Sequence, residues 1–294
     1  MVDLHIHTVH SDGAYTVGEI LDMAEGAKLD VISFTDHDCV GAYREIFENS
    51  GLLGRFSGKI VCGVEIAAAC CGVNIEILGY GVDWRVIEKE ITSDFMPSVR
   101  LFRANRLIEI LRAHGIEINI DKERLETDIT RWRPIYQWLV ENHADFLNNI
   151  NPEFTKNMGV FFRGGLCNKK SELFVDVSEK LRSAETVIGI IKKAGGQAFL
   201  AHPAEYFDSV PEILEYLKDK LNGVEVFHPS AGAEFRAVLL GYAKKNGLLV
   251  SGGSDFHGNE KLNRGAKEKL GVDERGLSGV LLAEAEAGED FVKG

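Results

Sequence analysis

The sequence predicts an α/β protein that is built on a parallel β-sheet. Seven short apolar segments have the pattern of strands, and they alternate along the chain with segments that have the periodicity of helices. This alternation is typical of parallel sheets, in which helices connect successive strands. If such a sheet closes, the carboxyl ends of all its strands lie on one face, so that side chains at those ends come together.

The composition indicates a globular protein with a small ligand. The 294 residues carry a net charge of −12, and 45% of them are hydrophobic. An acidic balance argues against a broad nucleic-acid-binding surface, so we expect a small-molecule partner and no stable nucleic-acid partner. No run of about eighteen apolar residues occurs, and the first strand begins too early for a signal peptide, so we expect no membrane segment. Five cysteines without a CxxC pair fit a reducing compartment, and we therefore expect a cytoplasmic protein.

The first predicted strand runs from Val2 to Ile6 and leads into a histidine-rich loop. His5 and His7 leave this strand on the same face, so their imidazoles can act together as a chelate. Asp12 follows within one turn and can return its carboxylate over the carboxyl end of the strand. A TxxE capping box that begins at Thr16 then predicts a helix.

The next three predicted strands each bring polar side chains into apolar surroundings. They span residues 31–34, 60–66 and 74–80. The first ends in the run TDHD, which contains His37, and the other two hold single carboxylates, Glu65 and Glu76, within otherwise apolar runs. Since a bare buried carboxylate costs several kcal/mol, each of these carboxylates needs a partner.

The pattern changes after residue 94, where the sequence becomes helical and polar. A long amphipathic segment ends at Gly115, and a further helix is predicted from Pro134 to Asn142. The segment from 148 to 170 is irregular and rich in Asn, Gly and Lys. We therefore predict an inserted, mainly helical cap subdomain at residues 95–182. The α/β domain would then consist of residues 1–94 and 183–294.

The α/β pattern resumes at residue 183 with a helix to Lys193. Three strands follow, at residues 197–201, 223–227 and 248–252. The polar side chains at their carboxyl ends are His202, His228, Asp255 and His257. Helices are predicted between these strands, the first with a capping box from Ser209 to Glu212 and the second at residues 233–245. A last edge strand is predicted at residues 277–282.

Ten residues with metal-binding side chains lie at or near the carboxyl ends of these strands. They are His5, His7, Asp12, His37, Glu65, Glu76, His202, His228, Asp255 and His257. Desolvation and like charges would oppose so many histidines and carboxylates around one opening unless cations were bound between them. Mixed nitrogen and oxygen ligands suit zinc, manganese or iron, whereas magnesium prefers oxygen. We therefore predict two or three divalent ions, and the choice among manganese, zinc, iron and magnesium stays open.

Six motifs occur in one order along the chain: DLHIHTVHSDG, FTDHD, GVEI, ILGYG, AHP and SDFHG. This ordered set resembles the motifs of the PHP (polymerase and histidinol phosphatase) superfamily, in particular its stand-alone metal-dependent phosphoesterases. The resemblance covers residues 2–81 and 195–258. It implies a distorted (β/α)7 TIM-like barrel, which agrees with the seven predicted strands.

The resemblance also implies a set of metal ligands. His5, His7, Glu65 and Asp255 would hold one ion, Glu65 would bridge to a second ion near His202, and Asp12, His37 and His257 would hold a third. One departure concerns the fourth strand, where relatives usually carry histidine, as in IHILGY, and this chain carries Glu76. Either Glu76 is an oxygen ligand in place of the imidazole, which we favour, or the second metal position is weakened.

The inserted segment ITRWRPIYQWLVE resembles the capping insertion of the nucleotide-directed members, usually an arginine followed two residues on by a histidine. Arg131 matches the arginine, and Arg133 stands where the histidine would be. We expect Arg131, helped by Arg133, to bind a non-reacting phosphate or the remainder of a nucleotide. A surface ion pair is the alternative for Arg131.

Hydrolysis of a phosphate ester is the reaction that follows from these assignments. Bound metal ions lower the pKa of a water molecule and neutralise phosphoryl oxygens, so that a metal-activated hydroxide can attack phosphorus. The candidate catalytic residues are His202, His228 and Asp255, and we expect the two histidines to hold the phosphate or to protonate the leaving oxygen. A pure metal-ligand role stays open for His202, and a hydrogen bond at the strand end stays open for His228.

Three functions remain in competition at this point. We favour a hydrolase for a small phosphate monoester, such as a nucleotide or nucleoside bisphosphate. The alternative is a phosphodiesterase or exonuclease on short oligonucleotides, since Trp132, Tyr136 and Trp138 could stack on a terminal base. A non-catalytic metal-binding module is favoured least, because the ligand set is nearly complete.

Overall fold

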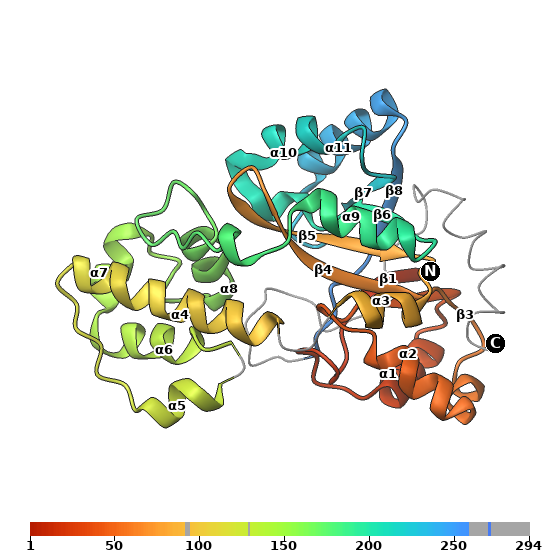
Figure 1. The fold of residues 1–294 in the computed structure, drawn as a ribbon, viewed down its shortest axis with the longest axis horizontal. Coiled ribbons are helices and arrows are strands. Elements are labelled where there is room, and N and C mark those ends of the chain that lie inside the picture. The colour runs from red at the N-terminus through yellow and green to blue at the C-terminus, as the bar shows by residue number, and fades with distance from the viewer. Residues whose placement is uncertain (92–94, 129, 259–269, 272–294) are drawn as a thin grey trace.

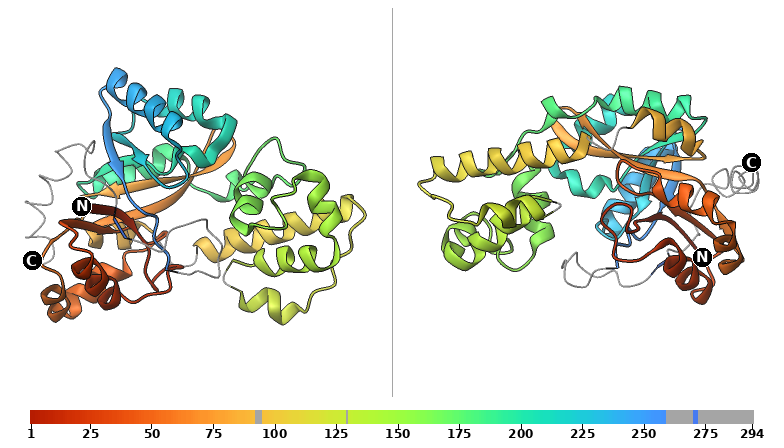
Figure 2. Two further views of the ribbon diagram at one scale, coloured as in Figure 1. Left: turned by 180° about the vertical axis from the view of Figure 1, so that it is seen from behind. Right: turned by 60° about the horizontal axis from the view of Figure 1, so that its bottom comes forward.

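The chain forms an α/β part and a group of helices that projects from one side of it (Figure 1; Figure 2). The computed structural model describes residues 1–91, 95–128, 130–258 and 270–271. All described strands belong to the α/β part, and the projecting helices, α4 to α8, come from the middle of the chain and lie at the left of Figure 1. The edge strand predicted at residues 277–282 lies outside the described residues.

The described strands form two sheets. Three parallel strands form the first sheet, in the order β1 (Val2–Ile6), β2 (Val31–Phe34) and β3 (Lys59–Ile60). Five strands form the second sheet, in the order β4 (Gly63–Cys70), β5 (Val73–Tyr80), β6 (Gln197–Leu200), β7 (Gly223–Phe227) and β8 (Leu249–Gly252). In this sheet β6, β7 and β8 are parallel, whereas β5 is antiparallel to both β4 and β6. The prediction of an all-parallel sheet was therefore wrong.

A tight hairpin between β4 and β5 accounts for this difference. Cys70 pairs with Val73, and the two residues between them, Cys71 and Gly72, have φ angles of 51° and 68°. Positive φ at both central positions is required by the type I′ turn, which matches the twist of the flanking strands. Such turns usually contain Asn-Gly or Asp-Gly, and this turn has cysteine in place of Asn or Asp, so the sequence did not indicate a hairpin. The chain therefore passes directly from β4 to β5, and the two strands run antiparallel, where the sequence predicted parallel strands.

Two isolated bridges join the sheets. Ile6, at the end of β1, pairs with Phe256 beyond β8, and His37, beyond β2, pairs with Glu65 in β4. The α/β class is confirmed, but the described strands form two bridged sheets, and the expected closure into a (β/α)7 TIM-like barrel is not found among them. The bridges nevertheless bring the carboxyl ends of β1, β2 and β8 to one place.

Helices pack against the sheets and share their hydrophobic core. They are α1 (Val17–Gly26), α2 (Gly41–Glu48), α3 (Trp84–Glu90), α9 (Ala184–Lys193), α10 (Val210–Leu217) and α11 (Ala233–Asn246). The capping box on α1 is confirmed, because the Thr16 side chain accepts a hydrogen bond from the Glu19 N–H and the Glu19 carboxylate accepts one from the Thr16 N–H. The capping box predicted at Ser209 is wrong. A 3₁₀ segment, η4 (Pro203–Ser209), leads straight into α10, and the Ser209 side chain makes no cap hydrogen bond.

The helices in the middle of the chain have a hydrophobic core of their own. They are α4 (Phe95–Ala113), α5 (Lys122–Thr127), α6 (Arg133–Asn142), α7 (Ala144–Ile150) and α8 (Met158–Val160), and a π-helical turn, η2 (Phe161–Leu166), follows α8. Leu107, Leu139 and Phe161 are fully buried in this separate cluster. The separate core supports an inserted subdomain, whose boundaries at residues 95 and 182 stay predictions. None of the described helices is long and apolar enough to span a membrane.

A buried tyrosine divides the strand predicted at residues 60–66 between the two sheets. Tyr43 is 2% exposed. Its hydroxyl lies 2.8 Å from the Phe34 carbonyl oxygen and 2.9 Å from the Val61 carbonyl oxygen, and it accepts a hydrogen bond from the Gly63 N–H. The hydroxyl thus satisfies backbone groups that a continuous strand would have paired, and β3 ends before β4 begins.

We expect Tyr43→Phe to lower the free energy of unfolding by about 1–3 kcal/mol, because the buried Gly63 N–H loses its acceptor and the Phe34 and Val61 carbonyls lose the one hydroxyl donor that they share. Urea denaturation followed by circular dichroism measures this change. Tyr216→Phe is the matched control, since the Tyr216 hydroxyl contacts Glu185 at the exposed surface, and its expected effect is below about 0.5 kcal/mol. Equal stability of the two variants would contradict the role given to Tyr43.

Candidate metal centre

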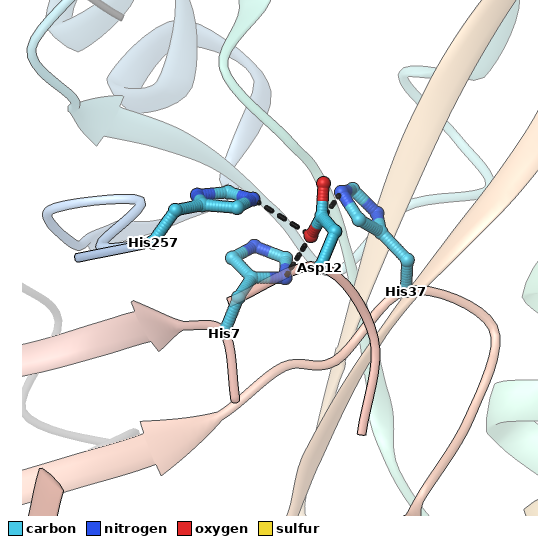
Figure 3. A group of neighbouring side chains, drawn as sticks. All are labelled: His7, Asp12, His37 and His257. Atoms are coloured by element: carbon cyan, nitrogen blue, oxygen red, sulfur yellow. Dashed lines mark ion pairs between the residues drawn. The ribbon is translucent and has the colours of Figure 1, made fainter. Parts of the chain in front are cut away.

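One carboxylate oxygen lies among three imidazoles at the carboxyl end of β1. Asp12 Oδ1 is 2.9 Å from His257 Nε2, 3.7 Å from His37 Nε2 and 3.9 Å from His7 Nδ1 (Figure 3). These side chains come from the three loops that follow β1, β2 and β8. The three residues expected to hold a third ion, Asp12, His37 and His257, therefore lie together, and His7 joins them.

Glu65 connects the two sides of the cluster. Its side chain is fully buried in β4. One oxygen, Oε2, lies 3.0 Å from His37 Nδ1, 3.3 Å from His5 Nε2 and 3.4 Å from His7 Nε2. The other oxygen, Oε1, lies 3.0 Å from His202 Nε2. Burial by itself would raise the pKa of Glu65, but the charges of His5 and His37 outweigh burial and hold the pKa well below its ordinary value.

Asp255 completes the group around His5 and His7. Its Oδ1 atom lies 3.1 Å from His7 Nε2 and 3.5 Å from His5 Nε2, and its Oδ2 atom lies 3.6 Å from His228 Nε2. The backbone of Asp255 has a φ of 54°, and that of His202 a φ of 26°. Such conformations cost on the order of 1–3 kcal/mol each and persist where the surroundings hold a functional side chain in place.

Buried ligand atoms without hydrogen bonds show that this cluster fits a metal ion. His5 Nε2, both ring nitrogens of His7, and Glu65 Oε2 are buried, and none has a hydrogen-bond partner in the described part of the chain. Leaving such atoms without partners is costly, and a divalent cation between them removes the cost. Nitrogen and carboxylate donors together suit zinc, manganese and iron.

The charges of the cluster are in conflict without a cation. Burial, together with the charges of His257 and His37, lowers the pKa of His7 to about 3. Burial also opposes protonation of His37, but the carboxylates of Glu65 and Asp12 outweigh it and raise the pKa of His37 to about 10. Neighbouring imidazoles thus differ widely in proton affinity. A bound metal ion would displace the proton from His37 and use the neutral lone pair of His7.

A second layer of carboxylates lies behind the predicted ligands, and sequence reasoning missed it. Glu225 in β7 is fully buried, and its Oε1 atom lies 3.0 Å from His5 Nδ1, which leaves His5 Nε2 to face the centre. Its Oε2 atom accepts a hydrogen bond of 2.7 Å from the His202 N–H. A carboxylate in this position fixes the orientation of a metal-binding imidazole. The signal was available, because Glu225 is a lone carboxylate in the apolar strand GVEVF, as Glu65 is in its own strand.

Two further buried aspartates hold the loops that carry ligands. Asp3 accepts hydrogen bonds from the Ser254 N–H and hydroxyl at 2.8 and 2.5 Å, directly before Asp255. Asp36 accepts hydrogen bonds from the Thr8 N–H at 2.7 Å and from the Ser11 hydroxyl at 2.6 Å. Both aspartates therefore fix backbone next to predicted metal ligands.

Glu76 has both histidine and arginine neighbours. Its Oε1 atom lies 3.8 Å from His37 Nδ1, and its Oε2 atom lies 3.1 Å from His202 Nε2 and 3.2 Å from Arg163 Nη1. Arg163 Nε in turn lies 2.5 Å from Glu205 Oε2. Neither Arg163 nor Glu205 was predicted, because Arg163 belongs to the irregular segment after α8, which has no periodic pattern.

A cavity of about 500 Å³ lies between the cluster and the projecting helices. On the cluster side its lining includes Asp12, His37, Asp38, Glu76, His228 and Asp255. On the helical side its lining includes Arg100, Arg103, Trp132, Arg133, Phe162 and Arg163. This volume is typical of small-molecule sites, and one wall is acidic and histidine-rich while the other is basic and aromatic.

The two predicted arginines differ in position. Arg133 lines the cavity, whereas Arg131 is not among the described residues that line it. Arg131 Nη1 donates a hydrogen bond of 3.3 Å to the Leu125 carbonyl, and its φ of 64° turns the chain immediately before α6. A substrate contact of Arg131 stays a prediction. The predicted aromatic residue Trp132 is stacked on Phe162, with ring centroids 4.8 Å apart.

His228 also lines the cavity, and its hydrogen bonds determine where its proton lies. Nδ1 accepts a hydrogen bond from the Ser230 N–H at 3.1 Å. The neutral imidazole therefore carries its proton on Nε2, which faces Asp255.

Comparison with known proteins agrees with this geometry. Residues 3–248 match the model of the PHP domain. A 3′,5′-nucleoside bisphosphate phosphatase of Chromobacterium violaceum is 30% identical over 261 residues, which cover 87% of either chain. A phosphoribosyl 1,2-cyclic phosphate 1,2-diphosphodiesterase of Eggerthella lenta is 27% identical, covering 87% of this chain and 94% of the relative. A 5′-3′ exoribonuclease of Haemophilus influenzae is also 27% identical, covering 87% and 89%.

Two solved structures are similar to nearly the whole of this chain. A structure described as an amidohydrolase from Chromobacterium violaceum, with bound sulfate, has a TM-score of 0.69 and 27% identity, covering 97% of this chain and 96% of that chain. A structure described as a metal-dependent phosphoesterase from Bifidobacterium adolescentis has a TM-score of 0.65 and 26% identity, covering 97% and 95%. The chain therefore belongs to the PHP domain family of metal-dependent phosphoesterases.

Proposed function

We propose that this protein hydrolyses a phosphate monoester on a small nucleotide, and that a nucleoside bisphosphate is the substrate class that suits its cavity best. The observation that carries the proposal is the pairing of two walls in one cavity, a cluster of metal-binding side chains opposite a cluster of arginines. The first wall suits the phosphate that reacts, and the second suits an anionic group that does not react. The relative named as a 3′,5′-nucleoside bisphosphate phosphatase supports this substrate class.

The metal-binding part of the proposal rests on the cluster around Glu65. The residues that we assign to divalent ions are His5, His7, Asp12, His37, Glu65, Asp255 and His257. When bound, such ions lower the pKa of a water molecule toward about 7 and neutralise phosphoryl oxygens. His202 and Glu76 were the remaining predicted ligands. Glu76 Oε2 contacts both His202 and Arg163, which supports a different role for this pair.

His228 has the chemistry of a proton donor in this reaction. Its Nδ1 atom accepts from Ser230, so its Nε2 atom carries the proton at the edge of the cavity. An N–H donor in this position can hydrogen-bond a phosphoryl oxygen or protonate the leaving oxygen. Asp255 Oδ2, 3.6 Å from this nitrogen, orients the ring.

The arginine wall supports a second anionic group on the substrate. Arg103 is 6% exposed, its burial lowers its pKa, and its Nε atom has no hydrogen-bond partner among the described residues. A buried guanidinium of this kind is costly until an anion pairs with it. Arg133 lines the same wall, and the stacked rings of Trp132 and Phe162 offer an apolar face for a base. The planar fork of guanidinium donors can pair with two phosphate oxygens at once.

A phosphodiesterase is the second candidate, because relatives at 27% identity are named as a cyclic phosphate diphosphodiesterase and an exoribonuclease. Turnover on nitrophenyl phosphate, bis(nitrophenyl) phosphate, adenosine 3′,5′-bisphosphate and a short 5′-phosphorylated RNA distinguishes the candidates. We expect turnover of the two monoesters and little turnover of the bis-ester or the RNA. Turnover of the bis-ester or the RNA alone would reject the monoesterase, and no turnover on any substrate with added Mn²⁺ would support a non-catalytic module.

We expect His5→Ala to lower kcat on nitrophenyl phosphate at least about 100-fold, because a lost ligand weakens metal stabilisation that is worth several kcal/mol. His10→Ala is the matched control. His10 lies three residues after His7, but its Nε2 atom pairs with Glu45 at 2.7 Å, outside the cluster. Elemental analysis of both variants should show metal loss in the first alone. If both variants keep the wild-type rate and metal content, the assignment of His5 is wrong.

We expect Arg133→Ala to lower kcat/KM on adenosine 3′,5′-bisphosphate by a factor that corresponds to about 1.5–3 kcal/mol, the usual value of a charged hydrogen bond. On nitrophenyl phosphate we expect kcat/KM to change little. The reason is that only the bisphosphate has a second anionic group to place on the arginine wall. Arg131→Ala provides the comparison and should have the smaller effect, since Arg131 does not line the cavity. A larger loss in Arg131→Ala would return the substrate contact to that residue, and equal losses of Arg133→Ala on both substrates would move Arg133 to the reacting phosphate.

A further inference from the structure

Arg163 is held between two carboxylates at the junction of the metal cluster and the cavity. Its Nη1 atom lies 3.2 Å from Glu76 Oε2, and its Nε atom lies 2.5 Å from Glu205 Oε2. The Arg163 side chain is 17% exposed, and those of Glu76 and Glu205 are 11% and 16% exposed. Arg163 thus forms two largely buried ion pairs, which hold its guanidinium in position. Removal of the guanidinium would leave two buried carboxylates without their counter-charge, which lowers stability.

The oxygen of Glu76 that contacts Arg163 is the one nearest His202. Glu76 Oε2 lies 3.1 Å from His202 Nε2, and His202 Nε2 lies 3.0 Å from Glu65 Oε1. The ligand pattern of the PHP family implies that a second metal ion would bind at these three side chains. Burial alone would raise the pKa of Glu76, but the charge of Arg163, together with the hydrogen bond and charge of His202, lowers this pKa to about 2. The Arg163 guanidinium lies directly beside the Glu76 carboxylate, with Nη1 3.2 Å from Oε2. The positive charge that Glu76 requires is therefore already present in the protein.

The charges of Glu76 and Arg163 compensate each other. A histidine at position 76 would be a neutral ligand, and Glu76 adds one negative charge. Arg163 adds one positive charge at the same carboxylate oxygen. A divalent ion bound to that oxygen would lie beside a guanidinium, and the two cations would repel each other strongly in a buried site.

We propose that Arg163 takes the place of one metal ion, so that the protein binds two divalent ions where its family's ligand pattern provides for three. This inference rests on the proposed metal-dependent function. The two remaining groups of ligands are independent of Arg163. One consists of His5, His7, Glu65 and Asp255, and the other consists of Asp12, His37 and His257. The ion pairs of Arg163 within the described residues involve only Glu76 and Glu205.

In this arrangement Arg163 is a positioning residue with a second consequence for the substrate. Arg163 lines the cavity together with Glu76. Its guanidinium, with a charge of +1, therefore occupies the place where a divalent metal ion, which can exchange with solvent, would otherwise bind. A guanidinium can hydrogen-bond a phosphoryl oxygen, but it cannot supply an activated water. Activation of water would then be confined to the two remaining positions, and Arg163 would contribute only charge and orientation.

The test is a count of metal ions in the full-length protein. The protein is dialysed to equilibrium against Mn²⁺, its metal content is measured by mass spectrometry, and anomalous diffraction at the manganese edge locates the ions. We expect two ions per chain in the wild type and no anomalous peak between Glu76 and His202. We expect three ions in Arg163→Met, because Glu76 and Glu205 lose their counter-charge. Arg133→Met removes another arginine of the cavity without touching Glu76, and should keep two.

Each outcome decides the inference. Three ions in the wild type, or a peak between Glu76 and His202, would overturn the role of Arg163 and leave the metal-dependent function standing. No bound ion in the wild type would reject the proposed function as well. A folded Arg163→Met variant that still binds two ions would also overturn the inference. If this variant does not fold, the wild-type count and the anomalous map decide alone.

Discussion

One buried charge, the carboxylate of Glu65, is the constraint on which the rest of this structure depends. The imidazoles of His5, His7 and His37 surround one of its oxygens, and His202 lies at the other. A carboxylate that is fully buried is stable only where cations or hydrogen-bond donors neutralise it. Glu65 also forms the isolated backbone bridge with His37 that joins the two sheets. The junction of the sheets and the candidate metal centre therefore share Glu65 and His37, and a shift of one would displace the other.

Three carboxylates behind the ligands explain how this arrangement is kept in place. Asp3, Asp36 and Glu225 are buried and are not among the residues that line the cavity, so their function is to hold neighbouring groups. Asp3 and Asp36 accept hydrogen bonds from backbone N–H groups of ligand-bearing loops, and Glu225 contacts the His5 ring. Preorganisation of this kind matters because a metal site tolerates displacements of only about half an ångström. The hydrogen bonds and contacts made by the neighbouring groups offset the free-energy cost of burying these carboxylates.

The residues of the candidate metal centre could be predicted from the sequence to the extent that they follow strand ends. His5, His37 and Asp255 were predicted in this way, and the structure brings them together because β1, β2 and β8 end at one place although the strands are not all parallel. Glu76 reaches the centre from within β5, which is antiparallel to its neighbours. This direction was not predicted, because the Cys-Gly turn before β5 lacks the usual signal of a hairpin. Arg163 could not have been found, since its contact with Glu76 joins residues 87 positions apart and its segment has no periodic pattern. Tertiary packing alone determines its place.

The charge of the chain bears on which phosphate ester can bind. A net charge of −12 repels a nucleotide at long range, but salt screens this repulsion beyond about 8 Å at physiological ionic strength. Inside the cavity Arg103 and Arg133 act at short range and in a poorly solvated environment, so local attraction prevails there. A nucleoside bisphosphate can place both phosphates within a cavity of about 500 Å³. An oligonucleotide would extend beyond it, and its outer phosphates would then face a chain whose remaining charge is strongly negative. This asymmetry supports the proposal of a small nucleotide substrate, and the argument does not depend on any contact to the base.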